Sequence, residues 1–363
     1  MRKILVIYSI LFFSVSVIWA SGSPESYADL GDAFGASTTQ NTGLTSFPTL
    51  NVPMGGEYEG MGTAYTAVLH DASYFDANAS GSSLLPHTEL SFLHNNWIAD
   101  TNIEGIVYTM RYDQLGLGVG AKFLHVPFTS YNSWGETPSI DSKAAKGHYT
   151  ETVAGINVSY NFFHSYEFHG IAAGATVKFA YRNIPSELYS YKYPNLGNQS
   201  ALAIMADLGI LTRLDLFKFY YSRSKNFSLG LALKNFGPAV GGDPLPTMLS
   251  PGISYSPIRP LLFSIDINIP FILPPPENSN PDSVQAEGIG FAVGTKVQIT
   301  NFFAMLTGFK IKGGNPRVSI GSNIDLDAVS LNVNYTLDLT TQMNRLDRFS
   351  VQASVNLGDM GRA

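Results

Sequence analysis

The histidines, serines and glycines of this chain do not form the sequence motifs that catalysis or cofactor binding would need. None of its seven histidines belongs to a HExxH motif or to another paired-ligand spacing that would hold a metal ion. Ser91 and His94 are near in sequence, but three residues along a strand place two side chains on opposite faces, so they cannot form a nucleophile and its base. The glycines at 116, 118 and 120 lack a Walker or dinucleotide fingerprint. We therefore expect no enzyme, no metal and no cofactor.

Three lysines could instead bind the head of a ligand. Lys122, Lys178 and Lys296 each stand on the small or polar side of a segment whose apolar residues recur at every second position. An ammonium group in such a place could bind a carboxylate in an otherwise apolar pocket, or it could be an ordinary solvated charge. Which role applies depends on the elements that carry the lysines.

The composition favours strands and excludes several partners. Only 14% of the 363 residues are charged, whereas 34 are glycine and 12% are aromatic. This mixture suits many strands joined by turns. The formal net charge of -6 lacks the basic footprint of a nucleic-acid-binding protein. Because the chain has no cysteine, a disulfide framework and a cysteine-based metal site are both impossible.

The first twenty residues have the pattern of a secretory signal peptide. Arg2 and Lys3 precede an apolar run over 4–19, and the small residues at 20–22 suit cleavage. An uncleaved membrane anchor is the alternative, although the run is short for a spanning helix. Beyond residue 20 no stretch approaches the length of a spanning helix, so the mature chain could cross a membrane only with strands. We expect 1–20 to direct export.

Alternation with a period of two fills the chain from residue 88 to its end. Within 153–162, Ile156 and Val158 are on one face and Asn157 and Ser159 are on the other. A soluble β-sandwich also alternates, but these runs are long enough to cross a bilayer at a tilt. Their second face is small, polar and sometimes charged, as in a barrel lumen. The fold class that we expect is all-β, a transmembrane antiparallel β-barrel.

We expect about fourteen strands, an even number as in single-chain outer-membrane barrels. They cover 88–97, 104–113, 115–125, 150–162, 168–181, 201–211, 226–236, 248–256, 260–269, 287–299, 302–311, 316–323, 327–339 and 347–357. The segments 248–256 and 316–323 are short and contain proline, so one hairpin could be absent.

The connections between these strands fit a barrel that is inserted in a membrane. Long links follow odd-numbered strands, as expected if those links all lie on the outer side. They cover 126–149, 182–200, 237–247 and 270–286. Two links are exceptions: the first link on the outer side is brief, and the 212–225 link is long for a turn on the opposite side. Aromatic residues near strand ends, such as Tyr220 and Tyr221, suit an interfacial girdle or, alternatively, ordinary hairpin anchors.

Ahead of the strands, 60–81 reads GMGTAYTAVLHDASYFDANASG. This stretch resembles the amino-terminal motif of the FadL/TodX outer-membrane transporter superfamily, which includes PorV-type proteins and a spirochaetal branch. Its members usually carry a glycine-rich segment, a DDAS-type turn and an Asn-Pro-Ala-Gly run that leads into the first strand. The residues that match this motif are Gly60, Met61, Gly62, Ala64, Tyr65, Asp71 and Gly81. At the Asn-Pro-Ala positions the chain has Asn78, Ala79 and Ser80, so the fixed φ of proline is absent.

The resemblance implies a fourteen-stranded barrel that is plugged by an amino-terminal hatch and lies in the outer membrane of a diderm bacterium. It implies passive uptake of long-chain fatty acids or other small hydrophobic molecules. The chain would then consist of a signal peptide at 1–20, a hatch at 21–87 and a barrel at 88–363. The residues that could line or gate the passage are Phe34, Leu44, Phe47, Leu50, Asn78, Ala79, Ser80, Lys122, Lys178 and Lys296.

Two alternatives stay open. The apolar hatch residues could anchor the hatch instead of lining a pocket. The barrel could also resemble PorV-type proteins in function and dock a surface or secretion partner through loops such as 126–149 and the proline-rich 270–286.

Overall fold

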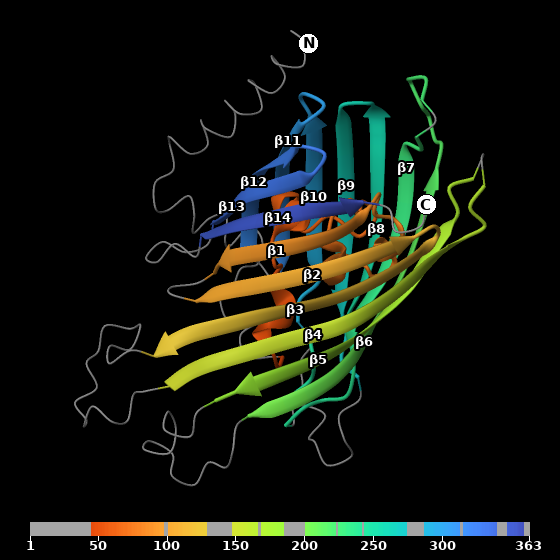
Figure 1. Ribbon diagram of the computed structural model, residues 1–363. Coiled ribbons are helices and arrows are strands. Elements are labelled where there is room, and N and C mark those ends of the chain that lie inside the picture. The colour runs from red at the N-terminus through yellow and green to blue at the C-terminus, as the bar shows by residue number, and fades with distance from the viewer. Residues whose placement is uncertain are drawn as a thin grey trace.

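The chain forms a closed antiparallel barrel of fourteen strands (Figure 1). The computed structural model describes residues 45–97, 101–128, 147–165, 168–184, 200–222, 224–241, 243–273, 287–312, 315–339 and 347–358. Each strand pairs with its neighbours in sequence, and β1 closes the barrel against β14. The strands are β1 (Thr88–Asn96), β2 (Asn102–Tyr112), β3 (Leu115–Phe128), β4 (Gly147–Phe162), β5 (Ile171–Asn183), β6 (Ala201–Leu214), β7 (Phe227–Phe236), β8 (Met248–Ile258), β9 (Leu261–Pro270), β10 (Gly290–Gln298), β11 (Phe303–Lys312), β12 (Asn315–Asp325), β13 (Val329–Asp338) and β14 (Arg348–Gly358).

All fourteen expected strands are present, including the two that contain proline. The pairing of β8 with β9 skips residues 250 and 251, where Pro251 has no N–H to donate. Pro316 stands at the beginning of β12, a position that strands tolerate. The hairpin whose existence was in doubt is therefore part of the barrel.

The two faces of the strands separate apolar from polar side chains, as the alternation predicts. On β4, Ile156 is 59% exposed, whereas Asn157 is fully buried. The same division runs around the barrel, so the outer wall is an apolar band and the inner wall consists of small and polar residues. This arrangement suits a lipid surrounding. Within the described ranges, no helix has the length and apolarity needed to cross a membrane.

The two ends of the barrel differ in their connections. One end carries the links that follow odd-numbered strands, and we call it the long-link end. The other end, which we call the short-turn end, carries tight turns such as those from β2 to β3 and from β8 to β9. The connections from β4 to β5, over 163–170, and from β6 to β7, over 215–226, are longer, and the second is the longest at this end.

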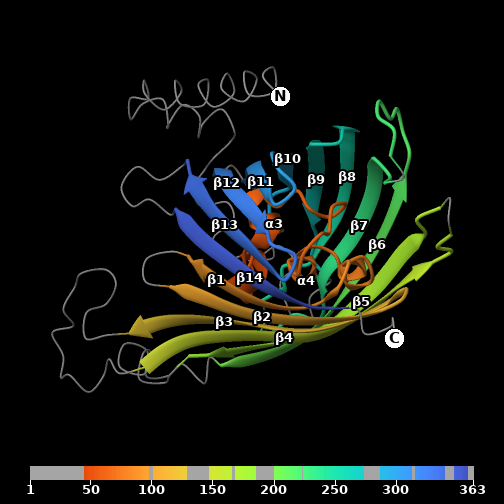
Figure 2. The ribbon, with the colours of Figure 1, turned by 45° about the horizontal axis from the view of Figure 1, so that its top comes forward.

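Residues 45–87, which we call the inner segment, lie inside the barrel (Figures 1 and 2). Its helices are η1 (Pro48–Asn51), α3 (Gly56–Gly60), α4 (Tyr74–Ala77) and η2 (Ala79–Ser83). Helix α3 contacts strands β11 to β14, and η2 contacts β2 to β6. Buried residues such as Tyr58, Tyr65 and Phe75 pack with strand residues into the main apolar core. The segment thus fills much of the space between opposite walls.

Glycines on the inner wall let the backbone of the inner segment touch the strands. A Cβ at Gly308 of β11 would stand 2.0 Å from the amide nitrogen of Gly62. A Cβ at Gly209 of β6 would stand 1.9 Å from Asn78 Oδ1. Gly62 itself has a φ of 62°, which favours glycine. These close approaches explain why small residues are frequent in the 60–81 stretch.

Some expectations fall on residues outside the described ranges. They concern the signal peptide at 1–20, the hatch before residue 45, Phe34 and Leu44, and most of the links at 126–149 and 270–286.

Candidate functional site

Ion pairs lie in the interior of the barrel, and several of them join the inner segment to the strands. Lys122, Lys178 and Lys296 all point inward, as their position on the polar strand faces predicts. Each of the three is paired with a carboxylate. Lys122 Nζ lies 3.0 Å from Asp76 Oδ1, Lys296 Nζ lies 2.5 Å from Glu57 Oε1, and Lys178 pairs with Asp207. A ligand carboxylate would have to compete with these partners.

Further polar contacts attach the inner segment to the wall. Arg348 of β14 lies 3.2 Å from Glu59 of α3. Asp266 of β9 accepts hydrogen bonds from the backbone amides of Tyr65 and Thr66, at 2.9 and 2.8 Å. Because buried charges are costly unless they are paired, these contacts hold the segment in one register against the strands.

The pKa of Glu57 reflects this pairing. Its burial would raise the pKa, but the Lys296 ammonium and His70 outweigh that effect and lower the pKa of Glu57 to about 2. Glu57 is therefore a charged, structural partner of Lys296.

The hatch-motif residues form the internal frame of the inner segment. The hydroxyl of Tyr65 donates to Asp71 Oδ1 at 3.0 Å and accepts from the amide of His70 at 2.7 Å. Asp71 Oδ2 also accepts from the amide of Glu57 at 2.9 Å. Met61 and Ala64 are fully buried, and a Cβ at Gly60 or Gly81 would collide with neighbouring side chains. These contacts give the motif a structural role.

Asn78, Ala79 and Ser80 are fixed to the wall in the same way. Asn78 Nδ2 donates to the carbonyls of Thr66 and Ile210, at 2.9 and 3.3 Å, and its Oδ1 accepts from the amide of Ser80 at 3.1 Å. The carbonyl of Ala79 accepts from Asn157 of β4 at 2.8 Å. Asn78 caps the amino end of η2, which begins with Ala79 and Ser80, and all three residues are buried.

Phe47 and Leu50 lie in different surroundings. Phe47 is fully buried in a cluster with residues of β4 to β6, which makes it an anchor of the inner segment. Leu50 lines a crevice at the long-link end. The structure thus brings Leu50 and Lys178 to one crevice, and Lys122 lies beside it, bonded to the lining residues Val52 and Asp76. Lys296 lies elsewhere in the interior.

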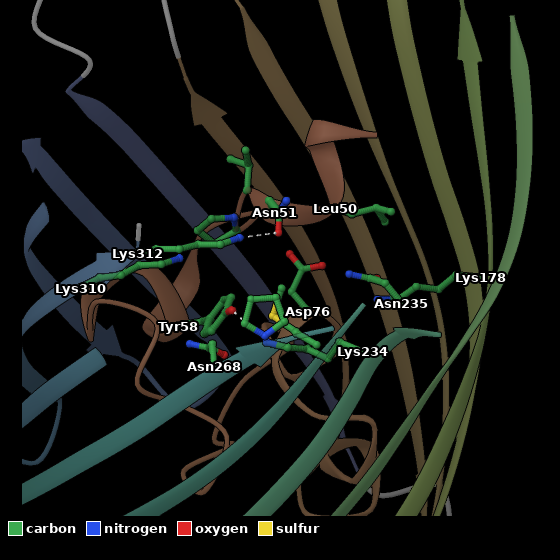
Figure 3. A pocket seen from close by; sticks show the side chains of 14 residues that line it. Leu50, Asn51, Tyr58, Asp76, Lys178, Lys234, Asn235, Asn268, Lys310 and Lys312 are labelled. Atoms are coloured by element: carbon green, nitrogen blue, oxygen red, sulfur yellow. Dashed lines mark hydrogen bonds between the residues drawn. The ribbon is translucent and has the colours of Figure 1, made fainter. Parts of the chain in front are cut away.

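The crevice at the long-link end gathers four lysines between the inner segment and the wall (Figure 3). These are Lys178, Lys234, Lys310 and Lys312. Apolar groups from Leu50, Val52, Met248 and Pro270 line the same crevice. Its internal space of about 30 Å³ holds little more than a water molecule. An amphipathic ligand would enter it head first.

Two of these lysines lack a carboxylate partner among the residues that the structure describes. Lys312 pairs with Glu287. Lys234 is 6% exposed, and its ammonium lies 3.5 Å from the Tyr58 hydroxyl and 5.7 Å from the centre of that ring. Lys310 makes no ion pair or hydrogen bond within the described ranges. Lys234 and Lys310 were not singled out from the sequence, although each stands on the polar face of an expected strand.

A larger cavity of about 630 Å³ lies at the short-turn end. It is bounded by the inner segment at Val68 and His70 and by residues of the β6–β7 link. Within the described part of the chain, no group of three or more potential metal ligands is assembled.

The fold is shared with solved outer-membrane channels. The chain resembles CymD, a monoaromatic hydrocarbon channel, with a TM-score of 0.55 and 12% identity over 84% of this chain and 97% of that one. It resembles the toluene transporter TbuX of Ralstonia pickettii with a TM-score of 0.51 and 13% identity, over 86% and 98% of the two chains. The fold class is therefore the one that these outer-membrane channels and transporters share.

Within that class, the chain belongs to the Uncharacterised protein family (UPF0164), whose model matches residues 26–359. A UPF0164 protein of Treponema pallidum (strain Nichols) is 25% identical over 342 residues, which are 90% of this chain and 74% of that protein. A second one from the same organism is 21% identical and covers 79% and 80% of the two chains. The spirochaetal resemblance seen in the sequence is confirmed.

Proposed function

We propose that this protein is a passive outer-membrane channel for small hydrophobic molecules that carry an anionic head, with long-chain fatty acids as the class that fits best. The apolar exterior and the likeness to outer-membrane barrels support a place in the outer membrane of a diderm bacterium, after export by the signal peptide at 1–20. The inner segment would serve as the hatch, together with the residues before it.

The observation that carries this proposal is the pair of unmatched ammonium groups of Lys234 and Lys310 in the crevice. Lys234 is buried and Lys310 is half-buried, so water screens both groups poorly, and a carboxylate that enters from the long-link end would gain two charge-assisted partners. The neighbouring apolar groups of Leu50, Val52 and Met248 would contact only the first carbons of an acyl chain, next to its carboxylate. The neutral ligands after which the solved neighbours are named would gain nothing from these lysines.

Binding of a fluorescent fatty acid to the purified barrel tests this proposal. The double variant Lys234→Met, Lys310→Met should weaken binding about tenfold or more, because two charged contacts are lost. The matched control is Lys296→Met with Glu57→Gln, which removes a lysine together with its partner outside the crevice and should leave affinity unchanged. Equal binding of a fatty acid and the corresponding fatty alcohol would refute the role of the lysines.

Partner docking, as in PorV-type proteins, is the second function considered from the sequence. The loops on which it depends lie mostly outside the described residues, and no contact in the described part favours it.

A further inference from the structure

The cavity at the short-turn end is lined by basic groups, and none of the described residues around it is Asp or Glu. The basic residues are His70, His169, Arg213, Lys225, Arg259 and Lys296. The two lysines have carboxylate partners outside the lining, with Lys225 Nζ at 2.6 Å from Asp215 and Lys296 Nζ at 2.5 Å from Glu57. The positive charge that is left for a ligand comes from the two arginines.

The hydrogen bonds of these two arginines go to main-chain carbonyls. Arg213 Nη2 donates to the carbonyl of Val68 at 3.1 Å, and Arg259 donates to the carbonyl of Tyr221. A guanidinium presents five N–H donors in a planar fork, so one carbonyl leaves most of them unused. Two such forks beside one cavity match the oxygens of a phosphate group.

One wall of this cavity is the β6–β7 link, described at 215–222 and 224–226. Lys218 holds the link in shape, because its Nζ donates to the carbonyls of Ser222 and Ser224, both at 2.6 Å. The link lines the cavity with Tyr220, among others. Its remaining aromatic side chains, Phe217, Phe219 and Tyr221, are 76%, 77% and 98% exposed.

The same link touches the outer wall of the barrel. Tyr255 of β8 has the same strand parity as Ile253, which is 43% exposed on the outer face. The hydroxyl of Tyr255 donates to the carbonyl of Phe217 at 2.8 Å. The Phe217 end of the link therefore lies beside the apolar outer band, at the end of the strands where aromatic side chains of barrels meet lipid headgroups.

We propose that the short-turn cavity binds the phosphate headgroup of an anionic phospholipid from the surrounding bilayer. Arg213 and Arg259 would hold the phosphate, and Phe217, Phe219 and Tyr221 would lie in the interfacial layer beside the lipid. This inference rests on the proposed function only in that the barrel must lie in a membrane. It gives the long β6–β7 link, unusual for that end of a barrel, a role.

Lipid retention tests this inference without any transport assay. The full-length barrel is placed in nanodiscs of phosphatidylcholine mixed with phosphatidylglycerol. The protein is then released from the nanodiscs in the mass spectrometer, and native mass spectrometry counts the lipids that remain bound to it. Wild type should retain phosphatidylglycerol in preference to phosphatidylcholine. The variant Arg213→Gln, Arg259→Gln should retain about tenfold less phosphatidylglycerol.

Two further variants control this experiment. Arg111→Gln removes an arginine that also bonds to main-chain carbonyls at the short-turn end but does not line the cavity, and it should change nothing. The single change Arg259→Glu, at an exposed position where folding is not at risk, should lower retention as well. Equal retention of the two lipids by wild type, or no effect of the arginine variants, would overturn the inference.

Competition separates the possible sources of the anionic group. Neither inorganic phosphate nor a fatty acid should displace phosphatidylglycerol from wild type. Displacement by the fatty acid would show that the cavity takes the transported carboxylate, and displacement by phosphate alone would show that it is a simple ion site. Either result contradicts a lipid site. A barrel that retains phosphatidylglycerol but binds no fatty acid would refute only the proposed transport function.

Discussion

The hydroxyl oxygens of Ser82, in η2, and Ser159, in β4, lie 2.7 Å apart inside the barrel. The amide of Ser83 donates to the same Ser159 oxygen at 2.7 Å, and Asn157 of β4 donates to the carbonyl of Ala79. All of these groups are buried. The end of the inner segment is thus bonded to the wall at several points, which indicates a fixed partition in this region of the barrel.

A disulfide at this contact should leave ligand passage intact. The chain has no cysteine, so the double change Ser82→Cys, Ser159→Cys introduces the only possible pair, and the short oxygen–oxygen distance suits a disulfide. If η2 is fixed, oxidised and reduced protein should transport fatty acid into liposomes at the same rate.

The matched control joins two strands instead of the inner segment. Ser91 of β1 and Ser354 of β14 have hydroxyl oxygens 2.6 Å apart, and a disulfide there only ties two paired strands. Loss of transport in oxidised Ser82→Cys, Ser159→Cys protein, with recovery on reduction and no effect in the control pair, would show that η2 must leave the wall.

The glycine contacts predict a sharp difference between two substitutions. Gly308→Ala would place a Cβ 2.0 Å from the backbone of Gly62, which cannot yield as a flexible side chain would. We expect the substitution to destabilise the folded protein by about 1–3 kcal/mol and to lower its melting temperature. Gly290→Ala is the control, since its Cβ would meet nothing closer than 3.4 Å. Equal melting temperatures of the two variants would contradict the observed packing.

Lowering the pH should destabilise helix α3 in its contact with the strands. The pKa of Glu57 is lowered from 4.5 to about 2 in the folded protein, because Lys296 and His70 outweigh the burial that would raise it. Its pairing therefore stabilises the fold fully above pH 4.5, and this contribution is lost as the pH falls towards 2. Hydrogen exchange of the α3 amides, corrected for intrinsic rates, should increase over that interval.

A second carboxylate acts in the opposite sense and needs a control. Burial and the neighbouring Glu57 raise the pKa of Asp71, so its protonation in acid relieves an unfavourable charge. The variant Glu57→Gln, Lys296→Met keeps Asp71 and should lose the acid-dependent rise in exchange. The same rise in this variant would exclude Glu57 as its source.

The sequence was sufficient to predict the wall of the barrel but not what fills it. Alternation reports directly which residues of β4 face lipid and which face inward, so strands and the inward direction of Lys178 follow from a local pattern. The pairing of Lys296 with Glu57 joins residues 239 positions apart, and it depends on the path of the inner segment. That path is set by close backbone contacts at glycines such as Gly308. The alternation of apolar and polar residues along a strand does not indicate which segment such a glycine will contact.

The choice of lysines shows the same limit. Lys122, Lys178 and Lys296 each stand on the polar face of a strand. Lys234 and Lys310 stand on such a face too, so the sequence pattern does not separate the two groups. Only the three-dimensional arrangement distinguishes lysines that have a carboxylate partner from those that face the crevice without one.

Uptake into proteoliposomes tests the central claim most directly. Wild-type barrel should carry a long-chain fatty acid into liposomes faster than it carries the corresponding neutral alcohol, relative to liposomes without protein. The variant Lys234→Met, Lys310→Met should reduce this difference about tenfold, because the crevice then lacks its two unmatched ammonium groups. If wild type carries both compounds equally, or if the lysine variant keeps the preference, the protein is not a channel selective for anionic amphiphiles.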